Sequence, residues 1–191
     1  ASDVYKRQAL TKVQAEAANY PFCTIDPNIG IVQLRDPRMA RLTELVSPER
    51  VVPATLRIVD IAGLVKGASQ GEGLGNQFLS HIRQVHAVAH VVRCFEDETG
   101  VHVDGKLDPV SDVQVIQTEL ILSDWEQVER KIERLTRQIK GERSLSDDLA
   151  VFERLRDHLG EGLLAINLAL GTEDKKRISE LSLLTLKPYL Y

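Results

Sequence analysis

Residues 53–75, PATLRIVDIAGLVKGASQGEGLG, are the stretch around which the rest of the sequence is organised. A mostly apolar run from residue 54 predicts a buried strand that ends at Asp60. A glycine-rich segment follows at once, with glycines at positions 63, 67, 71, 73 and 75. In an open α/β sheet, ligands bind where a strand ends and such a loop begins, so this stretch predicts a phosphate site.

Asp60 and Gly63 give this stretch its chemistry. A carboxylate at the carboxyl end of a strand can hold a hydrated Mg²⁺ ion. A glycine three residues later lets a main-chain N–H approach a terminal phosphate, because it has no Cβ in the way. The same residues also occur in an ordinary strand followed by a flexible loop, and that alternative stays open on the tetrapeptide alone.

The composition describes a globular chain. Its 191 residues, 43% of them hydrophobic, suit one domain with an insertion. It contains no apolar run near the roughly 18 residues of a membrane span, so we expect no membrane partner. The net charge of −4 argues against a chain that coats nucleic acid, and we expect no DNA partner. Cys23 and Cys94 have no metal-ligand spacing and favour a reducing compartment, hence the cytoplasm.

The first half of the chain alternates between strand and helix patterns. Apolar runs predict strands over residues 29–34, 54–60 and 87–94. Helical spacing predicts helices over residues 38–46 and 76–85. Over residues 54–94 the order strand, helix, strand indicates an α/β fold with a parallel sheet.

The second half predicts an antiparallel helical hairpin. A helix over residues 111–140 carries a coiled-coil seam with spacings of 4, 3, 4, 3 and 4, formed by Ile121, Trp125, Val128, Ile132, Leu135 and Ile139. A second helix over residues 146–159 offers apolar residues to close on it. A short helix over 173–181 and a strand from 184 to 191 follow. We therefore expect a sheet domain in residues 1–110, a helical insertion in 111–182 and a returning strand in 183–191.

Three stretches carry a resemblance to a known family: residues 19–28 (NYPFCTIDPN), 60–69 (DIAGLVKGAS) and 184–188 (LTLKP). Over residues 9–191 the chain resembles the YchF branch of the Obg-type P-loop NTPases. The resemblance implies a P-loop NTPase sheet, or G domain, with the helical hairpin inserted into it. It implies an Mg²⁺-dependent nucleoside triphosphatase, preferring ATP to GTP, that acts as a ribosome-associated switch.

The resemblance also assigns four site residues. Thr24 resembles the switch I threonine that ligates Mg²⁺, and Asp60 the aspartate that holds the same ion through water. Gly63 resembles the glycine whose N–H meets the γ-phosphate. Leu64 stands where Ras-like GTPases place a glutamine, and a leucine cannot orient the attacking water, so intrinsic hydrolysis is expected to be slow. The alternatives are a turn-forming threonine, a strand-end aspartate, a loop glycine and a leucine that packs beneath switch II.

The family's phosphate-binding loop, Gly-x-x-x-x-Gly-Lys-Ser/Thr, is expected just before residues 9–12. Asp3 and Val4 stand where the lysine and the hydroxyl residue belong, and neither suits a phosphate or Mg²⁺. We therefore expect a fragment or chimera that hydrolyses little by itself. Because the strand before that loop is central in this fold, the strands ending at Asp60 and starting at residue 87 are expected to lack a partner between them.

The hairpin surface over residues 126–143 carries six basic and four acidic residues. A solvated face with helical ion pairs explains this pattern, and the (i, i+4) pairs Glu126–Arg130 and Glu133–Arg137 favour it. Contact with the ribosome or its RNA is the alternative use. Two other functions stay open for the whole chain: a non-enzymatic adaptor that works through the hairpin, and an inactive domain that retains its loops for packing.

Overall fold

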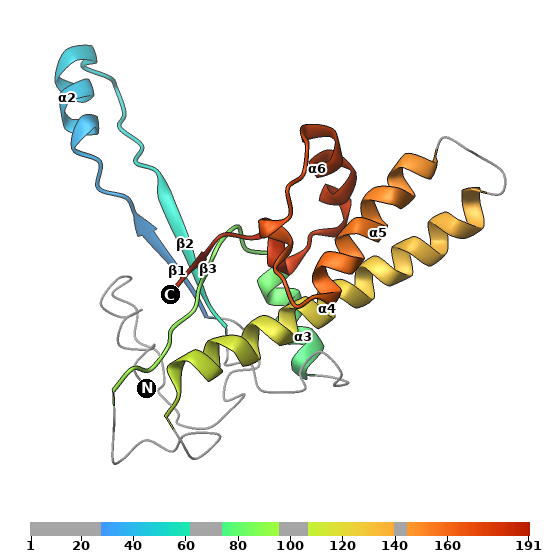
Figure 1. Ribbon diagram of the computed structural model, residues 1–191. Helices are drawn as coiled ribbons and strands as arrows, with labels where there is room; N and C mark the ends of the chain where they lie inside the picture. Colours follow the sequence, from blue (N-terminus) through green and yellow to red (C-terminus); the bar gives the residue numbers. More distant parts are fainter. Residues whose placement is uncertain (1–27, 62–73, 96–106, 140–144) are drawn as a thin grey trace. The chain divides into compact units, whose positions relative to one another are not determined.

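The structure of the protein, a computed structural model, describes residues 28–61, 74–95, 107–139 and 145–191. The chain folds as two compact units, Ala1–Ala62 and Gly63–Tyr191. The described part of the first unit is a two-stranded ribbon with one helix, and that of the second is a group of helices with a short two-stranded ladder (Figure 1).

An antiparallel ribbon forms the first unit. β1 (Asn28–Gln33) pairs with β2 (Thr55–Asp60), and the register places Asn28 opposite Asp60. Both strands lie where the apolar runs predict them, to within one residue at each end. The predicted burial of β2 is wrong, because its first three residues are exposed and its last three only partly buried. The pairing is antiparallel, unlike the predicted parallel sheet, because the chain leaves β1, forms a helix and returns in the opposite direction.

That connection contains α2 (Pro37–Val46). The side chain of Asp36 caps the helix by accepting a bond from the main-chain N of Arg38 at 2.9 Å. Pro37 occupies the first turn, where a missing N–H costs nothing. The helix ends at Ser47, whose φ of 44° is left-handed and whose N–H bonds to the Thr43 carbonyl. The predicted helix over residues 38–46 is therefore confirmed, together with its two ends.

Two long helices dominate the second unit. α4 (Pro109–Ile139) and α5 (Ser146–Gly160) lie side by side in opposite directions (Figure 1). Their bounds agree with the predicted helices over 111–140 and 146–159. α4 begins two residues earlier than predicted because the side chain of Asp108 accepts the Ser111 N–H at 3.1 Å.

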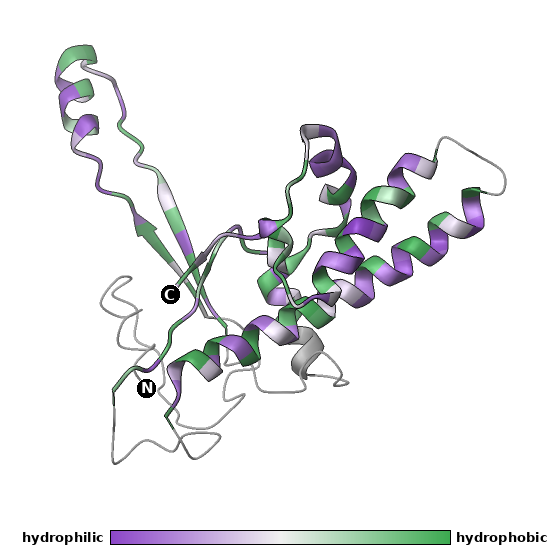
Figure 2. Ribbon diagram, in the orientation of Figure 1, coloured by the Kyte–Doolittle hydropathy of each residue, from purple (hydrophilic) through white to green (hydrophobic). Residues whose placement is uncertain are grey.

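The predicted seam of α4 is mostly buried against α5. Trp125 is an exception, with 36% of its surface exposed. Hydrophobic and hydrophilic residues alternate in bands along both helices (Figure 2), and among the described helices none is both long and apolar enough to cross a membrane. The shared core contains Ile121, Val128, Ile132 and Leu135 of α4 and Val151, Phe152, Leu155 and Leu159 of α5.

Short helical segments that follow α5 pack against the core of the hairpin. One of them, α6 (Thr172–Ile178), is joined to α5 by an ion pair of 2.8 Å between Arg177 Nε and Asp148 Oδ1. The predicted helix over residues 173–181 is found as α6 with the 3-10 turn that follows it. These segments are η2 (Ala165–Asn167), α6 (Thr172–Ile178), η3 (Ser179–Leu181) and η4 (Leu184–Leu186).

α3 (Leu74–Arg83) leads into the small sheet of the second unit. β3 (Val88–Ala89) pairs with β4 (Tyr189–Leu190) in parallel. Each described strand therefore pairs within its own unit, β1 with β2 and β3 with β4. A larger parallel sheet was the prediction, and the described residues show only this two-residue parallel ladder, with no ladder joining β2 to β3.

The predicted strands over residues 87–94 and 184–191 are thus too long. The second is short because its first residues use their main-chain donors elsewhere: the N–H groups of Leu184 and Thr185 bond to the side chain of Asp124. A 3-10 turn forms there in place of a strand.

Leu155 tests the hairpin core. Its side chain is fully buried between the helices, at 0% exposure. We expect Leu155→Ala to lower the free energy of unfolding by about 2–5 kcal/mol, because it removes buried methyl groups and leaves a cavity. Leu163→Ala, at a position 42% exposed, should cost far less. Urea unfolding followed by circular dichroism measures both, and equal losses would contradict the packing described here.

Candidate functional site

Asp60 is the one predicted site residue that lies within the described part of the chain. It ends β2, whose residues are exposed over the first half and partly buried over the second. The register places it opposite Asn28, the first residue of β1. Asp60 is therefore at the more sheltered end of the ribbon, beside the first residue of β1.

The other three predicted residues, Thr24, Gly63 and Leu64, lie outside the described residues. Their roles remain predictions. Within the described ranges no three His, Cys, Asp or Glu side chains gather into a metal-binding cluster. Mg²⁺ is usually bound through one or two carboxylates together with phosphate and water oxygens, so the single strand-end carboxylate of Asp60 is a group that could hold it.

A second group of polar side chains surrounds Asp124, in the middle of α4. Its carboxylate is fully buried, at 0% exposure. Oδ1 accepts the Leu184 N–H at 3.0 Å, and Oδ2 accepts the Thr185 N–H at 2.7 Å and the Thr185 hydroxyl at 2.8 Å. A buried carboxylate with three donors is well satisfied, so Asp124 fixes the start of η4 against α4.

Arg83, the last residue of α3, is the cation nearest to this carboxylate. Its Nη1 lies 3.5 Å from Asp124 Oδ1 and donates to the Ser182 carbonyl at 3.2 Å. Its Nη2 donates to the Ser123 hydroxyl at 2.9 Å. A single guanidinium therefore contacts both α4 and the segment before η4.

Lys187 holds the end of α3 from the other side. Its Nζ donates to the carbonyls of Arg83 at 3.1 Å and Val85 at 2.6 Å. A cation that binds the last carbonyls of a helix stabilises that end, because those carbonyls lack helical partners and carry the negative end of the helix dipole. α3 is thus anchored to the chain segment that leads into β4.

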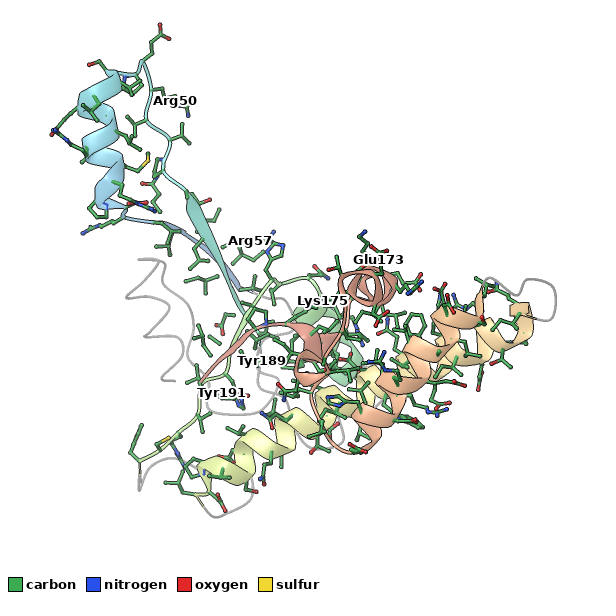
Figure 3. All side chains as sticks on the ribbon, turned by 45° about the horizontal axis from the view of Figure 1, so that its top comes forward. Arg50, Arg57, Glu173, Lys175, Tyr189 and Tyr191 are labelled. Atoms are coloured by element: carbon green, nitrogen blue, oxygen red, sulfur yellow. The ribbon has the colours of Figure 1, made fainter. Side chains whose placement is uncertain are left out.

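The two tyrosines of the C-terminal segment extend these contacts. The Tyr189 hydroxyl donates to the Leu184 carbonyl at 3.4 Å, and the Tyr191 hydroxyl accepts from Gln117 of α4 at 2.8 Å. Their rings stack with centroids 6.5 Å apart, and Figure 3 labels both side chains. β4 is therefore held to α4 as well as to β3.

Burial sets the electrostatics of this group. It raises the pKa of the Asp124 carboxyl above its ordinary value, and the donors of Thr185 and Leu184 and the charge of Arg83 oppose that rise. Burial also lowers the pKa of the Lys187 ammonium, with the nearby Arg83 charge acting in the same direction. The carboxylate and the residues Leu184 and Thr185 that donate to it are buried, while the cations Arg83 and Lys187 are partly exposed.

Sequence reasoning missed Asp124. Its position does carry a pattern, because Leu120, Asp124 and Val128 are four residues apart and share one stripe of α4. Leu120 and Val128 are buried, at 1% and 0% exposure, so a carboxylate between them is also buried. A charge in an apolar stripe predicts a partner, although the stripe alone does not identify which residues supply it.

The charged face of the hairpin is mostly the solvated surface predicted as the simpler explanation. Glu126 and Arg130 are paired at 3.8 Å, as predicted. The second predicted pair differs, since Arg137 Nε donates to the main-chain carbonyl of Glu133 at 3.2 Å. Arg134 and Arg137 are exposed on α4.

Comparison with known proteins decides the family. A family model described as 50S ribosome-binding GTPase matches residues 7–140. The ribosome-binding ATPase YchF of Escherichia coli O157:H7 is 51% identical over 184 residues, which are 96% of this chain and 51% of that protein. The chain belongs to this GTPase family, in its YchF branch.

Other YchF proteins agree with this assignment. The ribosome-binding ATPase YchF of Bacillus subtilis (strain 168) is 50% identical over 188 residues, 96% of this chain and 50% of that protein. The solved structure of the Schizosaccharomyces pombe YchF GTPase matches with a TM-score of 0.74 at 38% identity, over 100% of this chain and 52% of that one. The chain spans about half the length of the curated relatives it matches. The predicted P-loop GTPase fold, mixed α and β, is confirmed at this level.

Asp124 gives a direct test of the polar group in this YchF chain. We expect Asp124→Ala to lower the free energy of unfolding by about 3–5 kcal/mol, because it leaves Arg83 and three donors without their acceptor. Asp147→Ala, exposed in the first turn of α5, should cost less than about 1 kcal/mol. Urea unfolding compares the two, and a loss for Asp124→Ala no larger than the control's would show that the buried contacts contribute little.

Proposed function

We propose that this chain is part of an Mg²⁺-dependent nucleoside triphosphatase that acts as a ribosome-associated switch in the cytoplasm. The relatives' names, ribosome-binding ATPase and GTPase, support the reaction and the partner. The proposed nucleotide site uses Asp60 and Thr24 at Mg²⁺ and the Gly63 N–H at the γ-phosphate. In the proposed cycle, bound nucleotide orders the segments around Thr24 and after Asp60, and hydrolysis releases them.

The register of β1 and β2 is the observation that supports this site best. Asn28 lies opposite Asp60, and opposed residues in an antiparallel pair have Cα atoms about 4.5–5.5 Å apart. Thr24 precedes Asn28 by four residues, a length of chain that spans at most about 14 Å. Connectivity therefore keeps the Thr24 hydroxyl within reach of an ion held beside Asp60.

The chemistry follows from the residues. When bound, Mg²⁺ would neutralise charge on the β and γ phosphates during transfer to water. The Asp60 carboxylate would hold the ion's water, and Thr24 would supply one direct oxygen. Leu64 has no polar atom with which to place the attacking water, so the proposed hydrolysis is slow unless another group positions it.

ATP is the proposed preferred nucleotide, with GTP second. The preference comes from the YchF branch and its ATPase relatives. Competition between the two nucleotides for the full-length protein, measured by titration with Mg²⁺ present, tests the order. Tighter binding of GTP would reverse the preference and leave the hydrolase proposal in place.

Asp60 and Thr24 test the metal site. In the full-length protein, we expect Asp60→Asn and Thr24→Val each to lower Mg²⁺-dependent hydrolysis by about 10–100-fold, because each removes an oxygen that holds the ion or its water. Asp147→Asn, exposed on α5, is the matched control. The 191-residue chain, which contains no Gly-x-x-x-x-Gly-Lys-Ser/Thr sequence, should bind Mg-ATP far more weakly. Unchanged hydrolysis in both site variants would refute these roles.

The alternative function is a non-enzymatic adaptor that works through the hairpin. Its supporting observation is the exposed basic pair Arg134 and Arg137, which are free to meet phosphate groups of ribosomal RNA. An adaptor would bind ribosomes without regard to nucleotide. A switch would bind them differently with ATP, with ADP and with no nucleotide.

The basic pair has its own test. We expect Arg134→Glu with Arg137→Glu to weaken co-sedimentation with ribosomes, and the effect to shrink as salt rises, because phosphate contacts release counterions. Lys175→Glu with Lys176→Glu on α6 makes the same change of charge on exposed residues outside the hairpin face. If both double variants co-sediment equally, the hairpin face does not carry ribosome binding.

A further inference from the structure

The polar group around Asp124 joins three parts of the second unit that are far apart in the chain. Arg83 ends α3, Asp124 lies in α4, and Leu184 to Lys187 lead into β4. The bonds that connect them span 40 to 104 residues of sequence. The side chain of Arg83 itself bonds to Ser123 of α4 and to the carbonyl of Ser182.

These contacts restrict the movement of the end of α3. The guanidinium of Arg83 is held by Ser123, Asp124 and the carbonyl of Ser182, at 2.9 to 3.5 Å. The main-chain carbonyl of the same residue accepts from Lys187. A rotation or shift of α3 that moved Arg83 would therefore break bonds on both sides of the helix end, or carry α4 and residues 182–187 with it.

The position of α3 in the sequence suggests what these contacts do. α3 begins at Leu74, near the end of the glycine-rich segment 63–75, whose Gly63 the proposed function places at the γ-phosphate. α4 is one arm of the hairpin, whose basic pair the adaptor alternative places against ribosomal RNA. The described contacts therefore connect the helix that follows the nucleotide segment to the helix that carries the basic face.

We propose that Arg83, Asp124, Thr185 and Lys187 form a latch that couples the position of α3 to the helical hairpin. The latch deepens the proposed function and rests on it, since nucleotide binding is the event that it transmits. Asp124 is a positioning residue here. Its three bonds to η4 hold the acceptor in place, so that Arg83 meets a fixed partner, while Lys187 holds the main chain at the end of α3.

The variants chosen for the test leave Asp124 and its three bonds intact. Arg83→Gln removes the charge and the forked contact, and Lys187→Met removes the two bonds to the carbonyls at the end of α3 while keeping the length of the side chain. Arg41→Gln and Lys175→Met are the matched controls, because both side chains are exposed and lie outside the latch.

Hydrogen exchange in the full-length protein, with and without Mg-ATP, measures whether a change at α3 is transmitted to the hairpin helices. In the wild type, we expect nucleotide to change exchange in residues 74–83 and to change it by about fivefold or more in the hairpin helices. In Arg83→Gln and Lys187→Met, the change in residues 74–83 should persist while that in the hairpin falls below about twofold. The controls should behave as the wild type does.

The possible failures separate the two proposals. If the wild type binds Mg-ATP and the hairpin does not respond, or if both latch variants transmit the change fully, the latch is refuted and the hydrolase proposal stands. If the wild type binds no nucleotide, the proposed function fails. The latch is then judged without nucleotide: Lys187→Met should speed exchange at Leu184 and Thr185 as well as at the end of α3, and unchanged exchange there would refute it.

Discussion

The buried carboxylate of Asp124 is the constraint on which the second unit depends. Burying a charge away from water costs free energy unless hydrogen-bond donors or an opposite charge surround it. Here Leu184, Thr185 and Arg83 supply those partners. Satisfying that one charge requires α3, α4 and the segment before β4 to meet at a single place. Apolar packing in the hairpin constrains the sequence less, because apolar side chains of similar volume can replace one another with little loss of stability.

The same bonds explain why the ladder of this unit does not start before Tyr189. A main-chain N–H donates once, and the N–H groups of Leu184 and Thr185 are used by Asp124. Those residues cannot also extend a ladder, so pairing begins only at Tyr189. The sequence LTLKPYLY has the composition of a strand. Its first residues do not form one, because the main-chain N–H of Leu184 bonds to Asp124, about 60 residues earlier in α4.

Local patterns predicted most of the elements, because their evidence lies within one turn or one strand. The seam from Ile121 to Leu135 predicts α4 and its buried face, and the apolar run before Asp60 predicts β2. The length of β4 and the role of Asp124 depend on partners distant in sequence, so periodicity could not supply them. The candidate site divides in the same way: Asp60 is found at a strand end as predicted, while Thr24, Gly63 and Leu64 lie outside the described residues and stay predictions.

Strand direction decides which end of β1 lies beside Asp60, and so it bears directly on the proposed nucleotide site. In a parallel pairing of β1 with β2, Asp60 would lie beside Gln33, and Asn28 would be five residues away, about 17 Å along the strand. The segment that contains Thr24 would then start from the far end of the ribbon. The observed antiparallel register puts Asn28 beside Asp60, so only four residues separate the predicted hydroxyl from the strand end next to the carboxylate. The return of the chain through α2 thereby places Asp60 beside Asn28, the residue four positions after the predicted Thr24 ligand.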